Sequence, residues 1–388
     1  MKNKNKLRIV ALLLAVCTLI GSVALMSSCD YGVSSWQSLL GTTTTEGGDV
    51  TSTDPGKIDL SHMSISVQTR PATDLTPGTA AWVASECRDS VTEIYTTTAS
   101  GNGAGSGVFF THDDTYTYLL TNNHVIENAT KITVVDTAGN SYDGTLVGTD
   151  WISDIAVVRV QATGLKEATL GDGTTVLAED VVIIGNPLGT LGGSVTKGII
   201  SAQERQITVE GIKMTLIQTD ASVSPGNSGG AMFNMYGQLI GIINAKTVSS
   251  SAGDNGFAIP ITTALGVAEQ LLSQGYVSGR PYLGLSFKET GYSVVIGGSY
   301  LYADELAAGE SIEAGDILVS IDGMAVSSFS DVRGCLAAKN PGDRVELILQ
   351  RRRSAGWTQS YYETLTVTVT LHEYKPASTG DVQFETEN

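Results

Sequence analysis

One serine of this chain lies in a loop whose residue types suit nucleophilic chemistry. The loop runs from 220 to 230, DASVSPGNSGG, and places Ser228 directly before two glycines. Gly, Pro, Asn and Ser also form plain surface turns, so the loop alone does not identify a nucleophile. A serine that transfers acyl groups needs a base to take its proton and an acid to orient that base. The rest of the chain must therefore supply a histidine and a carboxylate.

The candidate base is one of four histidines. His62 lies in a polar stretch, His112 in the polar turn THDDT, and His372 near the carboxyl end of the chain. His124 follows the predicted strand 116–120 in LTNNHV, where a rigid element ends at a loop. This position favours His124 as the base, with a surface or capping role as the alternative.

Two aspartates compete for the role of the acid. Asp154 opens the predicted strand 155–160, and Asp150 precedes it by four residues in the turn GTDW. A carboxylate at the start of a strand is held more firmly than one in a turn. We therefore favour Asp154 and keep Asp150 as its rival.

Composition argues against other classes of site. The glycine-rich run 101–107, GNGAGSG, lacks the Gly-Lys-Ser/Thr ending of a phosphate loop and opens a strand. Cysteines and histidines are too few and scattered for a metal site. The net charge is −17, and the one basic cluster, 351–353, reads as a solvated strand end. We expect no cofactor, no metal and no nucleic-acid partner.

The order His124, Asp154, Ser228 is that of the chymotrypsin-type β-barrel proteases. Around these residues the chain resembles the HtrA/DegP family of envelope serine proteases, over roughly 80–371. The segments that carry this resemblance are TNNHV at 121–125, DIAV at 154–157, GNPLG at 185–189, VTKGIIS at 195–201, TDAS at 219–222, PGNSGG at 225–230 and GFAIP at 256–260. Two later segments, RPYLGL at 280–285 and GDILVSIDG at 315–323, resemble the PDZ domain of that family.

The resemblance implies a role for each of these residues. Ser228 would be the nucleophile, His124 the base and Asp154 the orienting acid. The N–H groups of Gly226 and Ser228 would form the oxyanion hole. Unfolded or damaged envelope proteins would be the substrates, and the protein would be a homotrimer active in protein quality control.

The PDZ-like region is expected to bind peptide C-termini. Its carboxylate-binding loop would consist of Tyr282, Leu283, Gly284 and Leu285, with the peptide added as a strand. The segment 287–313 departs from the apolar pattern of the family. Whether this region binds peptide therefore remains open at this level.

The primary specificity pocket is predicted to be uncharged. In chymotrypsin-type barrels its base is the residue six before the nucleophile, which is Ser222 here, and Ile243 and Ala245 lie in a nearby apolar segment. A Lys or Arg side chain would lose its hydration in such a pocket without gaining a counter-charge. We expect cleavage after Val, Ala, Ile or Leu.

The fold class is predicted to be mostly β: a chymotrypsin-like double six-stranded barrel followed by an α+β PDZ domain. Short β-branched runs separated by turns support the barrels. Apolar residues at helical spacing predict a helix over 261–274, capped by Gly275, and a short helix is expected within 80–90. In the second domain we expect strands at 282–287, 315–321, 345–350 and 365–371, and a helix over 332–339 behind a capping box at Ser328.

The amino terminus is predicted to export the protein and attach it to a membrane. Four cations precede an uncharged run from 9 to 26, which ends in Met26-Ser-Ser-Cys29, a segment similar to a bacterial lipobox. Lipidation at Cys29 is favoured over an uncleaved transmembrane anchor or a cleaved secretion signal, and all three place the protein outside the cytoplasm. Removal of 1–28 takes away four cations and no acid, which leaves a net charge near −21.

Five segments are expected along the chain. They are a signal or anchor segment at 1–29, a disordered Ser/Thr/Gly-rich tether at 30–78, the protease domain at 79–276, the PDZ-like domain at 277–374 and an acidic tail at 375–388. Two other functions remain in view. One is a chaperone or peptide-sensing protein with a latent triad, and the other, an acyl hydrolase of another fold, is disfavoured because strands and helices do not alternate.

Overall fold

The computed structural model describes residues 67–68, 78–186, 189, 192–245, 255–290, 299–304, 311–355 and 359–375. The predicted signal or anchor segment with Cys29, most of the tether and nearly all of the acidic tail lie outside these ranges. No helix among the described residues is long and apolar enough to cross a membrane.

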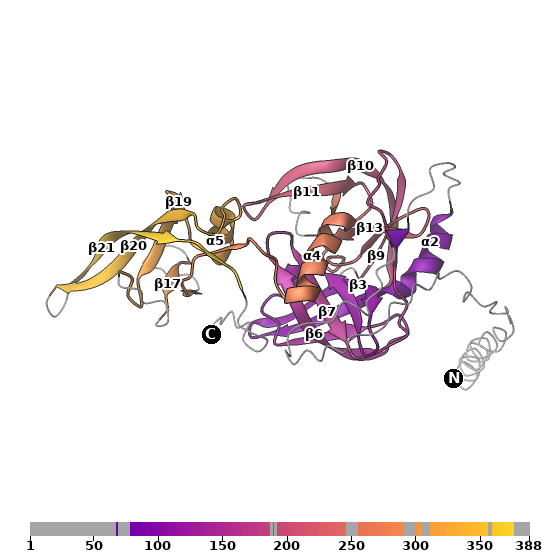
Figure 1. The fold of residues 1–388 in the computed structure, drawn as a ribbon, viewed down its shortest axis with the longest axis horizontal. Helices are drawn as coiled ribbons and strands as arrows, with labels where there is room; N and C mark the ends of the chain where they lie inside the picture. The colour runs from indigo at the N-terminus through magenta and orange to yellow at the C-terminus, as the bar shows by residue number, and fades with distance from the viewer. Residues whose placement is uncertain are drawn as a thin grey trace, which may run out of the picture. The chain divides into compact units, whose positions relative to one another are not determined.

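The first half of the protease unit is a closed barrel of six strands (Figure 1). The barrel is filled by buried side chains that include Ile94, Phe109, Leu119 and Val158. The strands follow the order β2-β3-β4-β7-β6-β5 and comprise β2 (Val91–Thr98), β3 (Gly101–His112), β4 (Thr117–Thr121), β5 (Lys131–Val135), β6 (Ser141–Asp150) and β7 (Ile155–Val160).

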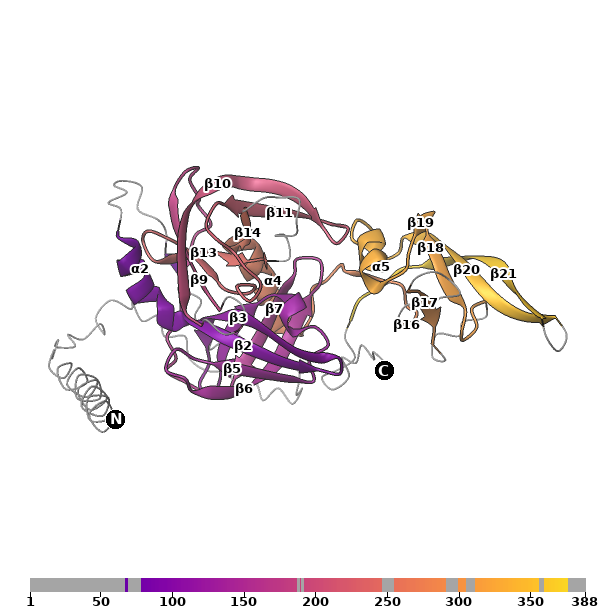
Figure 2. The same cartoon turned by 180° about the vertical axis from the view of Figure 1, so that it is seen from behind.

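The second half is also a ring of six strands. The run β13-β12-β9-β10-β11-β14 closes because β13 also pairs with β14 (Figure 2). The strands are β9 (Asp180–Gly185), β10 (Ser194–Val209), β11 (Ile212–Thr219), β12 (Ala231–Asn234), β13 (Gln238–Ile243) and β14 (Gly256–Pro260). The predicted double six-stranded barrel is confirmed.

Two short strands extend this sheet. β8 (Thr169–Gly171) pairs with β13, and β1 (Val67–Gln68) pairs with β8 in parallel. β1 thus lies within the segment predicted as a tether, where the edge of β8 offers backbone partners.

Two helices complete the protease unit. α2 (Ala80–Cys87) begins at Thr79, whose side chain accepts from Trp82 N. α4 (Ile261–Gln274) packs against β6, β7 and β13 and buries Val267, Ala268, Leu271 and Leu272. Gly275 ends α4 in the left-handed conformation, with φ of 83° and its N–H on Leu271 O. The predicted bounds and cap of this helix are confirmed.

The PDZ-like unit has its own core of buried residues, among them Leu301, Leu318, Val345 and Leu347. Its sheet follows the order β16-β17-β18-β20-β21, with β19 paired to β18. The strands are β16 (Phe287–Glu289), β17 (Leu301–Ala303), β18 (Ile317–Ile321), β19 (Met324–Ala325), β20 (Arg344–Ala355) and β21 (Gln359–Thr370), and β15 (Pro281–Tyr282) pairs separately with β22 (His372–Glu373).

Two predicted elements of this unit need correction. The strand expected over 282–287 is interrupted, because Gly284 adopts φ of 71° and separates β15 from β16. The helix α5 is Phe329–Leu336 rather than 332–339, since the capping box formed by Ser328 and Asp331 starts it three residues earlier.

Candidate active site

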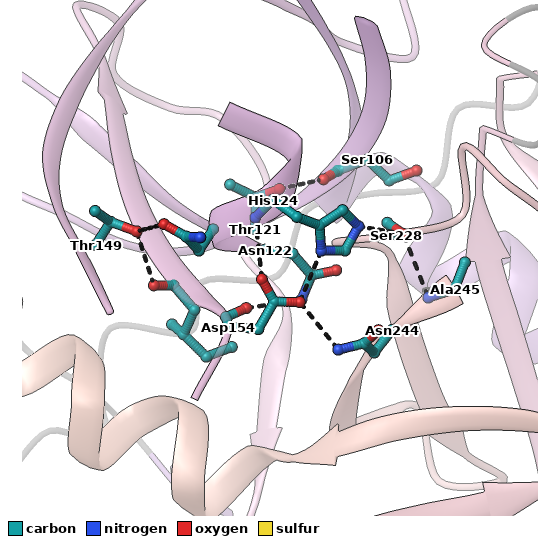
Figure 3. Close-up of polar contacts among 11 residues, drawn as sticks. Ser106, Thr121, Asn122, His124, Thr149, Asp154, Ser228, Asn244 and Ala245 are labelled. Atoms are coloured by element: carbon teal, nitrogen blue, oxygen red, sulfur yellow. Dashed lines mark hydrogen bonds and ion pairs between the residues drawn. The ribbon is translucent and has the colours of Figure 1, made fainter. Parts of the chain in front are cut away.

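His124, Asp154 and Ser228 form one continuous line of hydrogen-bonded side chains (Figure 3). The distance from His124 Nδ1 to Asp154 Oδ2 is 2.7 Å, and that from His124 Nε2 to Ser228 Oγ is 2.9 Å. The backbone N–H of His124 also donates to Asp154 Oδ1 at 3.0 Å. Both carboxylate oxygens are thus engaged by the same histidine, which fixes the ring against rotation.

The first barrel supplies both partners of the serine. His124 lies in the short helix α3 (Asn123–Ile126) after β4, not at the strand end that the sequence suggested. Asn122 Nδ2 and Asn123 N both donate to the backbone oxygen of Asp154, at 3.0 and 3.2 Å. The two asparagines of the segment TNNHV therefore tie the histidine turn to the aspartate turn.

Asp154 occupies a strained turn rather than the first position of a strand. Its φ is 56°, in the left-handed region, and β7 begins at the next residue. Asp tolerates this region better than most residues, but such a conformation costs about 1–3 kcal/mol and persists only where neighbours enforce it. The donors from Asn122, Asn123 and His124 provide that constraint here.

Asn244 is a site residue that the sequence did not reveal. It follows β13, is fully buried, and donates from Nδ2 to Asp154 Oδ2 at 2.9 Å. We had predicted its neighbours Ile243 and Ala245 as pocket residues and left the amide between them unassigned. An amide directly after the apolar run Leu239–Ile243 was the signal available.

The rival acid, Asp150, does not contact His124. Its buried carboxylate accepts from Arg280 Nε at 2.8 Å and Nη2 at 2.6 Å, and from Ser153 N and Oγ at 3.1 and 2.6 Å. Asp150 thus braces the turn that carries Asp154 and anchors the segment after α4.

The loop around Ser228 requires its glycines. Gly226 has φ of 96°, and Asn227 N donates to Ser224 O at 3.0 Å, which makes a tight turn before the serine. A Cβ on Gly229 would lie 2.1 Å from Ser106 O, and one on Gly230 would lie 2.6 Å from Ile184 O. Any side chain at position 229 or 230 would therefore clash with the backbone of β3 or β9.

The two N–H groups predicted to form an oxyanion hole lie in this loop. In the part of the chain that the structure describes, neither Gly226 N nor Ser228 N donates to a backbone carbonyl.

A cavity of about 460 Å³ opens beside the triad. One part of it is lined by residues around the triad, and the other part by residues between Thr96 and Ala104 in β2, β3 and the turn that joins them. The residues around the triad are His124, Val125, Glu127, Pro225, Gly226, Ser228 and Ala245. Of the predicted pocket residues, only Ala245 borders this cavity. Ser222 is exposed, with its carbonyl bonded to Thr196 Oγ1 at 3.0 Å, and Ile243 lies within the apolar core of the second barrel.

The predicted carboxylate-binding loop of the PDZ-like unit lies between β15 and β16. Tyr282 is half-exposed, Leu283 is buried and Leu285 is partly buried against the core of the unit. Gly284 packs against His372, since a Cβ there would lie 2.6 Å from the imidazole ring. The following strand, β16, is at the edge of its sheet, and Phe329 N at the start of α5 donates to Glu289 of that strand.

Comparison with known proteins places two domain families on the chain. A trypsin-like peptidase domain matches residues 105–242, and a PDZ domain matches residues 281–371. Both agree with the predicted fold class.

Similar curated proteins carry protease names. "Serine protease Do-like HtrB" of Bacillus subtilis is 36% identical over 286 residues, which cover 67% of this chain and 62% of the relative. "Periplasmic pH-dependent serine endoprotease DegQ" of Escherichia coli is 37% identical over 266 residues, 64% of this chain and 57% of the relative. "Serine protease Do-like HtrA" of Lactococcus lactis subsp. cremoris is 32% identical over 275 residues, 64% of this chain and 67% of the relative.

The chain thus spans less than two thirds of the first two relatives. Among solved structures, the serine endoprotease from Yersinia pestis is 30% identical, with a TM-score of 0.47 over 77% of this chain and 100% of that one.

Proposed function

This chain belongs to the Do-like serine protease family, HtrA/DegP, and from that premise we propose that it is a serine endopeptidase. One observation carries the proposal: the unbroken hydrogen bonds from Ser228 Oγ through the ring of His124 to the carboxylate of Asp154. A serine, an imidazole and a carboxylate in this order activate a hydroxyl for attack on a carbonyl.

Each residue has one task in the proposed reaction. Ser228 Oγ bonds to the carbonyl carbon of the scissile peptide while His124 Nε2 takes its proton. His124 then gives that proton to the leaving amine as the C–N bond breaks, and an acyl-enzyme remains. Water, deprotonated by His124, releases the acid and restores Ser228. Asp154 holds the ring in the required tautomer and stabilises its positive charge.

The oxyanion of each tetrahedral intermediate would lie on Gly226 N and Ser228 N. Donors placed in advance cost no reorganisation at the moment of reaction, and loss of one such donor typically costs about 2.7–4 kcal/mol of transition-state stabilisation. The positive φ of Gly226 supports this role, because it lets the chain bring the two N–H groups together.

The proposed substrates are unfolded or damaged polypeptides outside the cytoplasm. The names of two relatives, "Periplasmic pH-dependent serine endoprotease DegQ" of Escherichia coli and "Probable periplasmic serine endoprotease DegP-like" of Halomonas elongata, support this location. We propose attachment to the membrane through the amino terminus, by lipid on Cys29 or by an uncleaved anchor, and assembly as a homotrimer. Ala245, the one predicted pocket residue that borders the cavity beside Ser228, supports cleavage after small or branched aliphatic residues.

The PDZ-like unit is proposed to bind peptide C-termini. The N–H groups of the loop Tyr282–Leu285 would hold the terminal carboxylate, and the peptide would pair with the edge strand β16 beside α5. The edge position of β16 and the contact from Phe329 N to Glu289 support a groove at this place.

The test of the enzymatic proposal is labelling and proteolysis. Wild-type protein should react with a fluorophosphonate and cleave unfolded casein, and Ser228→Ala should do neither while it melts at the wild-type temperature. Mass spectrometry of the products should show cuts after Val, Ala, Ile and Leu. Equal proteolysis by purified Ser228→Ala contradicts the proposed nucleophile. Peptide binding without any labelling favours the latent binding protein, and a majority of cuts after Lys or Arg contradicts the uncharged pocket.

A further inference from the structure

Ser106 belongs to the glycine-rich run 101–107, which the proposed reaction leaves unexplained. Its side chain is fully buried in β3 and its Oγ lies 2.8 Å from the carbonyl oxygen of Gly226 and 2.9 Å from the backbone nitrogen of Asn186. Its backbone N–H donates to Ser228 O at 2.8 Å, and its carbonyl accepts from Thr121 Oγ1 at 2.8 Å. Every polar group of this residue thus has a partner, and the contact with Thr121 is drawn in Figure 3.

The direction of both hydroxyl contacts is settled by chemistry. A backbone N–H can only donate and a carbonyl can only accept, whereas a hydroxyl has one proton and two lone pairs. Ser106 Oγ therefore accepts from Asn186 N and donates its proton to Gly226 O. The hydroxyl thus links the backbone at Asn186 to the backbone at Gly226.

The hydrogen bond from Ser106 Oγ to Gly226 O fixes the peptide that follows Gly226. Glycine has no Cβ and adopts positive and negative φ with similar ease, so this residue alone would not hold one orientation. The peptide between Gly226 and Asn227 is held at its nitrogen by Ser224 O and at its oxygen by Ser106 Oγ. With that peptide fixed, the Cα atom of Gly226 is fixed as well. The N–H of Gly226, which belongs to the preceding peptide, is thereby left with fewer orientations relative to the N–H of Ser228.

The hydrogen bond from Asn186 N to Ser106 Oγ connects the serine to a residue that β2 also contacts. Asn186 Nδ2 donates to Glu93 Oε2 at 3.3 Å, and Tyr95 OH contacts the same carboxylate oxygen and lies 3.3 Å from Gly189 O. Both Glu93 and Tyr95 come from β2 of the first barrel. The backbone N–H that donates to Ser106 Oγ therefore belongs to Asn186, whose side chain is held by Glu93 of β2.

We propose that Ser106 is a positioning residue of the oxyanion hole, which keeps Gly226 N oriented for the tetrahedral intermediate and ties this orientation to the segment at Asn186. It does not touch the substrate and acts only through the backbone of 226–228. The inference rests on the proposed acyl-transfer activity. Because Ser106 affects only the tetrahedral intermediate, its loss should lower kcat without a matching rise in KM.

The test compares two buried serines of the protease unit. Ser90 is also fully buried, and its Oγ donates to Cys87 O at 2.7 Å, but its contacts do not include the triad or the 226–228 loop. Ser106→Ala and Ser90→Ala each remove one buried hydroxyl donor. Cleavage of a peptide with valine before the scissile bond gives kcat and KM. Inhibition by a peptide boronic acid ending in boro-valine reports the oxyanion hole, because the tetrahedral boronate places an oxygen there.

We expect Ser106→Ala to lose about 10- to 100-fold in kcat, less than direct loss of an oxyanion donor, with KM within about threefold. Boronate affinity should fall by the same factor as kcat. Ser90→Ala should keep both values within about twofold, even if it melts at a lower temperature. If Ser106→Ala matches Ser90→Ala in kcat and boronate affinity, or changes only KM and melting temperature, the proposal is wrong.

A second variant covers failure of Ser106→Ala to fold. Ser106→Cys keeps nearly the same volume with a weaker donor, so smaller losses of kcat and boronate affinity are expected at near-native melting temperature. Wild-type boronate affinity in Ser106→Cys overturns the proposal. Failure of the wild type to cleave or to bind boronate refutes the proposed protease function instead, so the two failures are distinguishable.

Discussion

The protease unit and the PDZ-like unit use their polar residues in opposite ways. Around the triad, polar side chains are buried and tied to each other: Ser228, Asp154 and Asn244 are 5%, 7% and 0% exposed. In the PDZ-like unit the proposed ligand loop is at the surface, with Tyr282 41% exposed. A catalyst has to hold its groups before the reaction, whereas a peptide-binding edge has to stay open to be paired.

The difference is partial for charged groups. The protease unit buries the carboxylates of Asp150 and Asp154 among dedicated donors. The PDZ-like unit buries Asp316 against Arg351 in the same way, but both side chains of its Arg353–Glu363 pair are partly exposed. Substitutions near the triad should therefore change kcat, and substitutions in the PDZ-like unit should change stability or binding.

The largest effect is expected from Asp154→Asn. The amide keeps the shape of the carboxylate but favours the wrong tautomer of His124. The equivalent change in a chymotrypsin-type triad lowers kcat by about 10⁴-fold. We expect a loss of this order with little change in melting temperature. Peptide hydrolysis and thermal unfolding of the purified variant check both values.

Asp150→Asn is the matched control for that experiment. It leaves Arg280 without its counter-charge, and breaking a buried ion pair typically costs about 3–5 kcal/mol of stability. We expect a lower melting temperature with most of the kcat retained in folded protein. Equal kcat losses in both variants would show that Asp150 shares in the chemistry.

Asn244→Ala should lower kcat by about 10-fold with KM nearly unchanged. A hydrogen bond to a charged group is worth about 1.5–3 kcal/mol, and Asp154 would lose the donor on Oδ2. Asn234 is the control, because it is equally buried in the same barrel and donates to Gln238 instead. Should Asn234→Ala lose as much kcat as Asn244→Ala, the effect is one of folding, not of the triad.

The sequence predicted those parts of the site that are encoded locally. His124, Asp154 and Ser228 each stand in a short motif, and α4 shows its bounds through helical periodicity. The supporting contacts were missed because their partners are distant in sequence: 90 residues for Asn244 and Asp154, 120 for Ser106 and Gly226, 130 for Arg280 and Asp150.

Two strands of the barrels also depend on distant partners. β6 and β10 contain many polar or exposed positions, SYDGTLVGTD in β6 and AQERQITV at the end of β10, so alternation is weak. Both form because neighbours in the barrel pair with their backbones: β6 lies between β5 and β7, and β10 between β9 and β11. A pairing partner is not visible in the residues of the strand itself.

In the PDZ-like unit, Asp331→Ala should reduce stability and leave kcat of the triad unchanged. The variant removes half of the capping box of α5, which typically costs about 1 kcal/mol. Burial raises the pKa of Asp331, but hydrogen bonds from Ser327 and Ser328 outweigh it and leave this pKa below the usual value.

The sign of this shift gives a pH test. A carboxylate with a lowered pKa stabilises the fold above its unfolded pKa, near 3.9, and loses that contribution as the pH falls through the folded value. The difference in melting temperature between wild type and Asp331→Ala should therefore be largest near neutral pH and shrink below about pH 4. A difference that stays constant down to acid pH contradicts the role of the ionised carboxylate.

The smallest effect is expected in the labelling of two thiols, one from each unit, and its test needs no substitution. Cys87 and Cys335 are both free and buried among the described residues. Burial raises the pKa of the Cys87 thiol to about 11 and raises that of Cys335 as well. Since the thiolate is the reactive form, both should react slowly with iodoacetamide in native protein at pH 8.

The two thiols should differ in labelling once denaturant is added. Cys335 packs in the PDZ-like core, which contains fewer buried residues than the core that holds Cys87, and a smaller core stabilises its domain less. Peptide-level mass spectrometry should show Cys335 labelled at a lower denaturant concentration than Cys87, and simultaneous labelling would mean that the two units unfold as one.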